Sequence, residues 1–324
     1  MARYLVTGVA GFIGSAIARA LVGRGDDVRG LDDFSTGKPE NIAELKGRLD
    51  FREITLLDPA GLASACRGVD YIFHEAAVPS VPRSVAEPRY TNSVNVEGTL
   101  NLLLAARDAG VRRVIYAASS SAYGESPILP KREDMLPHPI SPYAAQKLMG
   151  EHYMQVFASV YGLETVSLRY FNIFGPRQDA NSQYSAVLAK FITLMLQGQA
   201  PTIFGDGEQS RDFTYVDNAV RANLLAAHAS AEEVSGRVFN VATGTRFSLN
   251  QTFKLLQCVT GFSGAANYAQ LREGDIKHSL ADISLAQKHL KYSPSVSFEE
   301  GLRRTVDWYR QVLTGTLSAA ASVR

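Results

Sequence analysis

The sequence predicts an α/β fold in which a doubly wound parallel sheet is joined to a smaller C-terminal lobe. In the N-terminal half, short β-branched apolar runs alternate with helical patterns, as they do when parallel strands are covered by helices on both faces. After Asn172 the sequence changes to loops that contain Gly and Pro. The 324 residues, 46% of them hydrophobic, suffice for a sizeable core that two lobes share.

The expected elements follow from the spacing of apolar residues, which is continuous in short buried strands and three to four residues in helices. We expect strands at Tyr4–Thr7, Asp27–Leu31, Tyr71–Glu75, Arg113–Ala117 and Thr165–Tyr170. We expect helices at Ile13–Arg24, Leu62–Cys66, Val94–Ala109 and Ala144–Tyr161. An amphipathic segment at Tyr184–Gln197 and a turn-rich segment at Phe204–Asp217 indicate a lid. In an open sheet of this kind, ligands bind at the carboxyl ends of the strands.

Composition excludes several classes of function. The formal net charge is +1 with no block of like charges, which argues against binding to nucleic acid or to an anionic membrane surface. No apolar run reaches the roughly 20 residues of a membrane span, and the N-terminus does not have the pattern of a signal peptide, so we expect a soluble, cytoplasmic protein. Cys66 and Cys258 are too few for a disulfide framework or a metal site, and we expect both to be inert core thiols.

Three glycines follow the first expected strand and open the first expected helix, as Gly8, Gly11 and Gly14. Such a turn lets the backbone approach a pyrophosphate closely. The helix that begins near Phe12 and Ile13 presents free N–H groups and a positive dipole end to an anion. The sequence therefore predicts a dinucleotide site, although a glycine-rich turn before a buried helix is an alternative.

Two acids, Asp32 and Asp33, end the second expected strand. A carboxylate at this position can bind the ribose hydroxyls of adenosine, and it repels a 2′-phosphate. The pattern therefore indicates a Rossmann-like site that prefers NAD to NADP. The alternative is a pair of solvated loop acids.

Tyr143 and Lys147 lie four residues apart at the start of an expected helix, so their side chains share one face. A nearby ammonium can lower the pKa of a phenol by roughly 1–3 units, and the positive nicotinamide ring of NAD acts in the same direction, so we expect Tyr143 to act as a base. The hydroxyls of Ser119, Ser120 and Ser121 follow a strand, where one of them can bind the substrate oxygen and relay its proton. In isolation, a Tyr-x-x-x-Lys pattern is usually a pair on a helix surface.

These motifs occur in the order and spacing of a known family. They are Gly8/Gly11/Gly14, Asp32, His74-Glu-Ala-Ala77, Asn95, Ser119-Ser-Ser-Ala-Tyr-Gly124, Tyr143-x-x-x-Lys147 and Arg169-Tyr-Phe-Asn172. The chain resembles the extended short-chain dehydrogenase/reductases and, among them, the UDP-galactose and UDP-N-acetylglucosamine 4-epimerases, over nearly its whole length up to about Trp308. The resemblance implies an NAD-dependent nucleotide-sugar isomerase.

The resemblance also implies roles for individual residues. Ser119 would bind the substrate oxygen, Tyr143 would be the base, and Lys147 would bind the nicotinamide ribose. The implied cofactor contacts are Gly8, Gly11, Phe12, Ile13, Gly14, Asp32, Asp33, Ser35, Gly37, Ala76, Tyr143, Lys147 and Tyr170. The implied substrate contacts are Ser80, Arg83, Ser120, Ser121, Asn172, Arg211, Arg272 and Ser279. Among these, Asn172 and the two arginines 211 and 272 match the family's ligands of the diphosphate. In one departure, the family's adenine-contacting Asp is replaced by Thr55.

The change of sequence after Asn172 predicts a division of the chain into two interleaved lobes. Residues 1–171 would form the NAD-binding domain, to which a segment near 213–241 returns. Residues 172–212 and 242–315 would form the lobe that binds the UDP-sugar, and residues 316–324 a frayed tail. The resemblance, in turn, implies a homodimer joined by the helices Val94–Ala109 and Ala144–Tyr161.

The residues after Ser119 narrow the reaction. Related 4,6-dehydratases and UDP-glucuronate decarboxylases carry an acid there, whereas this chain has Ser120 and Ser121, so we expect the 4-keto sugar simply to be reduced again. Ser279 matches a position where a Tyr excludes a 2-N-acetyl group and a small residue admits it. We therefore expect UDP-GlcNAc and UDP-GalNAc as substrates, together with UDP-glucose and UDP-galactose. The alternatives are a UDP-glucuronate 4-epimerase, a nucleotide-sugar dehydratase or decarboxylase, and a non-catalytic NAD-binding regulator.

Overall fold

A computed structural model describes residues 2–180, 187–270 and 277–315 of the chain. Its centre is a seven-stranded sheet in the order β11-β6-β5-β4-β1-β2-β3, in which every neighbouring pair is parallel. The strands are β1 (Arg3–Thr7), β2 (Asp27–Asp32), β3 (Asp50–Glu53), β4 (Tyr71–His74), β5 (Arg113–Ser119), β6 (Glu164–Tyr170) and β11 (Arg237–Val241). The predicted doubly wound α/β fold is confirmed.

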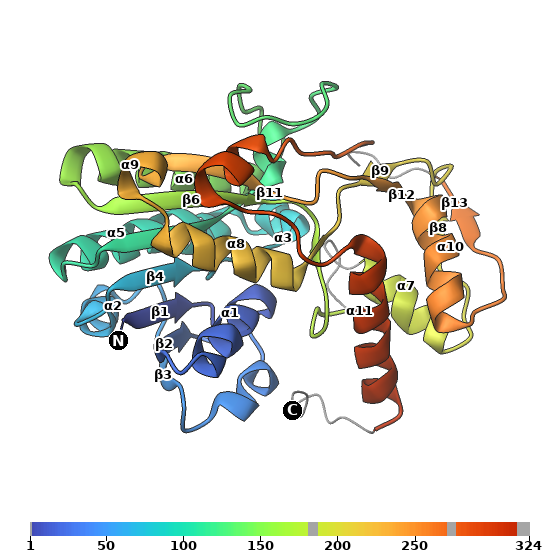
Figure 1. The fold of residues 1–324 in the computed structure, drawn as a ribbon, viewed down its shortest axis with the longest axis horizontal. Coiled ribbons are helices and arrows are strands. Elements are labelled where there is room, and N and C mark those ends of the chain that lie inside the picture. Colours follow the sequence, from blue (N-terminus) through green and yellow to red (C-terminus); the bar gives the residue numbers. More distant parts are fainter. Residues whose placement is uncertain (1, 181–186, 271–276, 316–324) are drawn as a thin grey trace.

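Helices cover both faces of this sheet (Figure 1). On one face, α1 (Phe12–Gly23) packs beside α8 (Val216–His228), and both contribute to a hydrophobic core with the strands. On the other face, α2 (Pro59–Cys66), α5 (Gly98–Asp108) and α6 (Pro142–Tyr161) enclose a second core. The five strands and four helices expected in the N-terminal half are therefore present, with ends that differ by a few residues.

Two strands of the sheet were not expected from the sequence. β3 carries Asp, Arg and Glu among its four residues at the sheet edge, none of which is buried, so its apolar signal is weak. β11 comes from far along the chain and pairs with β6 at the opposite edge. Because α8 and β11 lie within residues 213–241, this segment joins the sheet, while the division into a cofactor domain and a substrate lobe stays a prediction.

The expected helix Val94–Ala109 begins with a wide π-helical turn, Ser93–Glu97, before the regular helix α5. The side-chain oxygen of Asn95, inside this turn, accepts a hydrogen bond from the Val78 N–H at 2.7 Å. Its amide nitrogen donates to the Gln146 side chain on α6 at 2.9 Å. Asn95 therefore fixes the loop after β4 to the helix that carries Tyr143.

Short elements connect the large ones near the strand ends. They are two 3-10 turns, Pro39–Asn41 and Ala43–Leu45, α3 (Val81–Ala86), α4 (Pro88–Asn92), the 3-10 turn Ser120–Tyr123, α9 (Ala231–Val234) and the π-helical turn Ala286–Leu290.

A second group of elements lies beyond the sheet, at the right of Figure 1, around a third hydrophobic core. Its helices are α7 (Val187–Leu196), α10 (Leu249–Thr260) and α11 (Phe298–Leu313). Its strands form three two-stranded pairs: β7 (Ile173–Phe174) with β10 (Thr214–Tyr215), β9 (Ser210–Arg211) with β12 (Phe247–Ser248), and β8 (Thr202–Phe204) with β13 (Asn267–Ala269). The first residues of the expected segment Tyr184–Gln197 lie outside the described residues, and its remainder forms α7.

The expectation that both cysteines are core thiols is wrong for Cys258. Cys66 is buried, but Cys258 is exposed on α10, whose buried side is formed by Leu249, Phe253 and Leu256. Cys258 is two residues past Leu256, a step that turns it away from this side of the helix. Within the described residues, none of the helices combines the length and apolar character that a membrane span requires.

Candidate active site

The glycine turn links β1 to α1 and leaves no room for side chains. Gly8 has a φ of 65°, and a Cβ atom on it would lie 2.7 Å from the Ala76 backbone nitrogen. A Cβ atom on Gly14 would lie 2.2 Å from the Gly8 carbonyl oxygen. Gly11 precedes α1, and no side chain caps the helix start at Phe12. Free N–H groups at a helix start with a bare backbone before it suit the pyrophosphate of a dinucleotide.

Asp32 holds the loop after β2 against this turn. Its buried carboxylate accepts hydrogen bonds from the Ala10 N–H at 2.9 Å and from the Phe34 N–H at 2.8 Å. Burial raises the pKa of this carboxyl, and the two backbone hydrogen bonds oppose that effect. A Cβ atom on Gly37 would lie 2.6 Å from an Asp32 oxygen, so a side chain here would have to displace the Asp32 carboxylate. Asp32 thus has a structural role in addition to the predicted contact with ribose, which stays a prediction.

The other acid and hydroxyl of this loop lie beside Asp32. The Ser35 N–H donates to an Asp33 side-chain oxygen at 3.0 Å. Ala76, at the facing end of β4, donates its N–H to the Thr7 hydroxyl at 3.2 Å. The predicted cofactor residues that follow β1, β2 and β4 therefore lie together at the carboxyl ends of these strands.

The expected catalytic residues lie at the ends of β5 and β6 and on α6. Ser119 ends β5, in register with Tyr170 at the end of β6. The Ser119 hydroxyl interacts with the Tyr143 phenol and accepts a hydrogen bond from the Ser121 hydroxyl at 2.8 Å. Lys147, almost fully buried, donates from Nζ to the Ala117 carbonyl oxygen on β5 at 2.9 Å. The structure therefore brings Ser119, Tyr143 and Lys147 together.

Two hydrogen bonds fix the first turn of α6. The Ser141 hydroxyl caps the helix by accepting the Ala144 N–H at 3.2 Å. The Tyr143 N–H donates to the Ser84 hydroxyl of α3 at 3.0 Å. Ser84 was not singled out in the sequence, and the partner it finds lies 59 residues away. Its contact holds the backbone of Tyr143 against α3.

The electrostatics of this pair differ from the expectation. Burial raises the pKa of Tyr143 to about 12, the Ser119 hydrogen bond lowers it and the Glu75 carboxylate raises it. Burial lowers the pKa of Lys147 to about 8, against the opposing effect of Glu75 and Glu151. The prediction that Lys147 lowers the pKa of Tyr143 is therefore wrong for this structure, because burial dominates and the ammonium is directed at the Ala117 carbonyl.

A second group adjoins this set: it contains Tyr170, an expected cofactor contact, and Glu75, to which the sequence analysis assigns no role. The Tyr170 phenol donates to the Glu75 carboxylate at 2.8 Å and accepts a hydrogen bond from the Asn223 amide at 2.7 Å. Burial raises the pKa of Glu75 to about 7. The sequence signal that could have indicated Glu75 is its position as an acid directly after the wholly buried strand β4.

The expected substrate residues form two groups. Ser80 caps α3 by accepting the Arg83 N–H at 3.2 Å, and the Arg83 guanidinium pairs with Glu87 and lies over the Tyr90 ring. Ser120 and Ser121 form the turn that follows β5. These residues therefore border Tyr143 from α3 and from β5.

The second group lies in the lobe beyond the sheet. Asn172, at a φ of 41°, donates its amide to the Asp212 carbonyl oxygen at 3.0 Å. The Ser279 N–H donates to the Ser210 carbonyl oxygen at 2.9 Å, next to Arg211 in β9. Asn172, Arg211 and Ser279 are thus connected through neighbouring backbone, and Arg272 lies outside the described residues.

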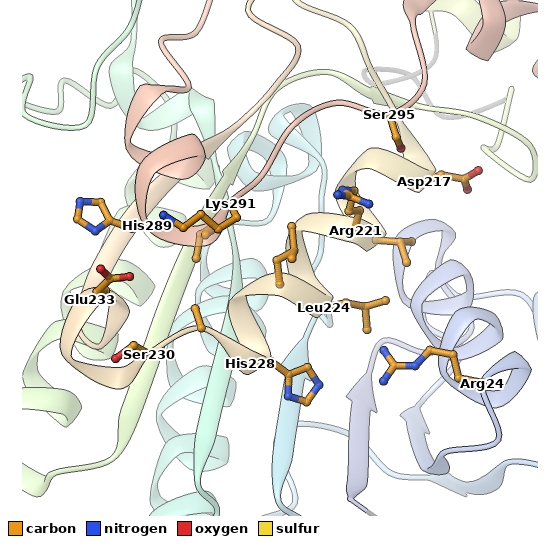
Figure 2. Close-up of a pocket in the computed structure, with 14 residues that line it drawn as sticks. Arg24, Asp217, Arg221, Leu224, His228, Ser230, Glu233, His289, Lys291 and Ser295 are labelled. Carbon is orange, nitrogen blue, oxygen red and sulfur yellow. The ribbon is translucent and has the colours of Figure 1, made fainter.

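A pocket on the outer side of α8 is separate from these residues. Figure 2 shows its lining, which includes Arg24 of α1, Arg221 and His228 of α8, and Lys291. Among the residues that the structure describes, none of those predicted for cofactor, catalysis or substrate lines it. This surface depression therefore plays no part in the site.

A parallel sheet with a bare glycine turn after β1 and a Ser–Tyr–Lys set at the end of β5 and on α6 defines a nicotinamide-dependent enzyme of the short-chain dehydrogenase/reductase type. Residues 4–242 match the model of the NAD dependent epimerase/dehydratase family, so the chain belongs to that family. It is accordingly an NAD-dependent enzyme, and its relatives include nucleotide-sugar 4-epimerases.

Three solved structures illustrate the similarity. UDP-glucose 4-epimerase from Thermotoga maritima is 41% identical with a TM-score of 0.91, over 96% of this chain and 99% of that one. UDP-N-acetylglucosamine 4-epimerase from Methanobrevibacter ruminantium, solved with UDP-N-acetylmuramic acid, is 44% identical with a TM-score of 0.90, over 95% and 98% of the two chains. UDP-glucuronic acid 4-epimerase from Bacillus cereus, solved with UDP-glucuronic acid and NAD, is 34% identical with a TM-score of 0.88, over 96% and 99%.

Proposed function

We propose that this enzyme interconverts UDP-GlcNAc and UDP-GalNAc, and also UDP-glucose and UDP-galactose, by 4-epimerisation. The observation that carries the proposal is the small side chain of Ser279, whose backbone is tied to β9 beside Arg211. A small residue leaves space for a 2-N-acetyl group that a Tyr would fill. The similarity to the Methanobrevibacter ruminantium enzyme supports the same substrate class.

In this reaction Tyr143 takes the proton of the sugar 4-hydroxyl, and Ser119 binds the same oxygen. NAD, when bound, would supply the hydride acceptor for C4 and the hydride donor for reduction of the 4-keto sugar on its other face. Burial holds the Tyr143 proton firmly, with a pKa of about 12. The positive charge needed to release that proton at neutral pH would come from the cofactor's cationic ring, because the Lys147 ammonium is directed at the Ala117 carbonyl oxygen. Arg211 and Asn172 hold the diphosphate while the sugar turns.

The absence of an acid at the turn after β5 favours epimerisation over dehydration or decarboxylation. Ser120 and Ser121 are the side chains of that turn, and neither can deliver a proton to C6 as a carboxylic acid does. We therefore expect the 4-keto sugar to react only by reduction back to a hexose.

A second candidate is a UDP-glucuronate 4-epimerase, as in the Bacillus cereus relative. It would use the same Ser119, Tyr143 and Lys147 and differ in the group that meets the substrate's carboxylate. Arg83 is the cation nearest to the Tyr143 backbone along α3, but its guanidinium pairs with Glu87 and lies over Tyr90. That engagement favours an uncharged sugar.

The test is to incubate the purified enzyme, without added reductant, separately with UDP-GlcNAc, UDP-glucose and UDP-glucuronate, and to follow each sugar by proton NMR. We expect the 4-epimer from UDP-GlcNAc and UDP-glucose with no net NADH. An epimer from UDP-glucuronate alone, or a pentose or a deoxyketo sugar, would contradict the substrate or the reaction.

We also propose that two chains associate through α5 and α6. The outer side of α6 exposes Met149 at 47%, Val156 at 46% and Val160 at 66%, at helical spacing. Apolar side chains gathered along one helix face indicate a protein interface. Light scattering after gel filtration should give twice the chain mass, and Val160→Glu should reduce it to a single chain; a monomeric wild type would contradict the interface.

A further inference from the structure

Glu75 lies where three strands of the sheet end side by side. It directly follows β4, which pairs with β5, and β5 pairs with β6. Tyr170 ends β6 in register with Ser119 at the end of β5, and its phenol donates to the Glu75 carboxylate at 2.8 Å. The carboxylate is therefore fixed beside the catalytic set and does not turn freely to solvent.

The titratable groups that interact with Glu75 are Tyr170 on β6 and Lys147 and Tyr143 on α6. Three further groups adjoin Tyr143 or Lys147: Tyr116 on β5, Glu151 on α6 and His74 on β4. His74 is neutral, because burial lowers its pKa to about 3. Lys147 supplies the positive charge of this set, and the Glu75 carboxylate raises the pKa of both Lys147 and Tyr143.

A carboxylate is a costly side chain at this position. Burial raises the pKa of Glu75 to about 7, so the fold itself disfavours the ionised form, and the Tyr170 hydrogen bond and the Lys147 charge only partly offset this. An apolar side chain would fill the same space without that cost. The retained charge therefore points to an electrostatic role toward its neighbours.

We propose that Glu75 is a positioning residue whose negative charge, held in place by Tyr170, sets the proton balance between Tyr143 and Lys147. This inference rests on the proposed 4-epimerase function, in which Tyr143 is the base. When Glu75 is ionised, Lys147 keeps its proton to higher pH and Tyr143 releases its proton less readily. When Glu75 is neutral, both groups lose their protons at lower pH.

The variant Glu75→Gln removes the charge but keeps the size of the side chain and an oxygen that can accept from Tyr170. We expect both limbs of the bell-shaped dependence of kcat/KM on pH to move to lower pH by roughly 1 unit, with little change in KM. Glu75→Asp, which keeps the charge, should retain the wild-type pH position even if its rate falls. A loss of rate at every pH with both limbs in place, or no change at all, would overturn the proposal.

A second measurement does not depend on turnover. The ultraviolet absorbance of tyrosinate is titrated in the enzyme with its cofactor, with Tyr143→Phe as the reference in the wild-type and Glu75→Gln backgrounds. The difference assigned to Tyr143 should appear at lower pH in Glu75→Gln, and an unmoved difference would contradict the proposal. If the wild type epimerises no UDP-sugar, the proposed function fails, while this titration still decides whether Glu75 acts on Tyr143.

Discussion

At the end of β1 the site is made of backbone, whereas at the ends of β4, β5 and β6 it is made of side chains. Around Gly8 and Gly14 the structure excludes even a Cβ atom. By contrast, the Tyr143 phenol and the Lys147 ammonium of α6 lie with the Ser119 hydroxyl at the end of β5 and the Glu75 carboxylate after β4. The comparison teaches that the first region is specified by shape and the second by charge, so substitutions should damage them in different ways.

The largest effect is expected from the side-chain region. Tyr143→Phe removes the acid/base and leaves the packing of the ring, so kcat should fall by about 10²–10⁴, while folding and NAD binding are retained. Turnover by NMR and cofactor content by absorbance check this. Wild-type turnover in the variant would contradict the assignment of the base.

The backbone region should respond by losing the cofactor and stability. Gly14→Ala places a Cβ atom 2.2 Å from the Gly8 carbonyl oxygen, so the turn must shift, at a cost of about 1–3 kcal/mol in the free energy of unfolding. The matched control is Gly23→Ala in the same helix, where nothing lies within 4 Å, and which should not lose stability. Denaturant unfolding measures the stability of each variant, and gel filtration measures how much NAD it retains. Equal effects of Gly14→Ala and Gly23→Ala would contradict the steric argument.

The buried His74 provides a test of charge through the pH dependence of stability. Its ring is hydrogen-bonded to Thr7 at 2.8 Å and to Thr99 at 3.0 Å. Burial lowers its pKa from 6.5 to about 3, so between these two pH values the imidazole is protonated in the unfolded chain and neutral in the folded protein. Stability from this group is complete above pH 6.5 and is lost as pH falls, by about 2 kcal/mol at pH 5.

The measurement is the difference in unfolding free energy between the wild type and His74→Gln, followed from pH 7 to pH 5. Glu75 acts in the opposite direction, because burial raises its pKa to about 7. Because the wild type and His74→Gln both contain Glu75, its contribution cancels in the difference between their unfolding free energies. A difference that does not vary with pH would show that His74 is not held neutral.

The smallest expected effect is one of selectivity. Ser279→Tyr should lower kcat/KM for UDP-GlcNAc by about tenfold, the order of effect of a steric change in a pocket, and leave UDP-galactose nearly unaffected. Ser279→Ala is the matched control and should keep both activities. Unchanged selectivity in Ser279→Tyr would refute the role of this position.

The two regions also differ in how far the sequence predicts them. The glycine turn and the Tyr143–Lys147 spacing are local patterns, so the positions of Gly8, Gly14, Ser119 and Lys147 in the fold agree with the expectation. The pKa of Tyr143 was wrongly predicted, because it depends on burial and on the direction of the Lys147 side chain, neither of which is local. The roles of the individual site residues stay predictions.

Other misses have the same origin. The contact of Glu75 with Tyr170 joins residues 95 positions apart, which no local pattern records. The edge strand β3 has too few apolar residues to be recognised, and β11 joins the sheet by pairing with β6, which lies far from it in the sequence. Local periodicity therefore predicts the interior of the sheet better than its two edges.

The pairing of β11 with β6 has a consequence for how the chain folds during synthesis. Until the ribosome has released residues through Val241, one edge of β6 has no partner, and the core beneath α8 is open. An unpaired strand edge is a template for association with other chains. A nascent chain that pauses between β6 and β11 is thus most vulnerable to aggregation, and a fragment cut after the sixth strand would carry that vulnerability permanently.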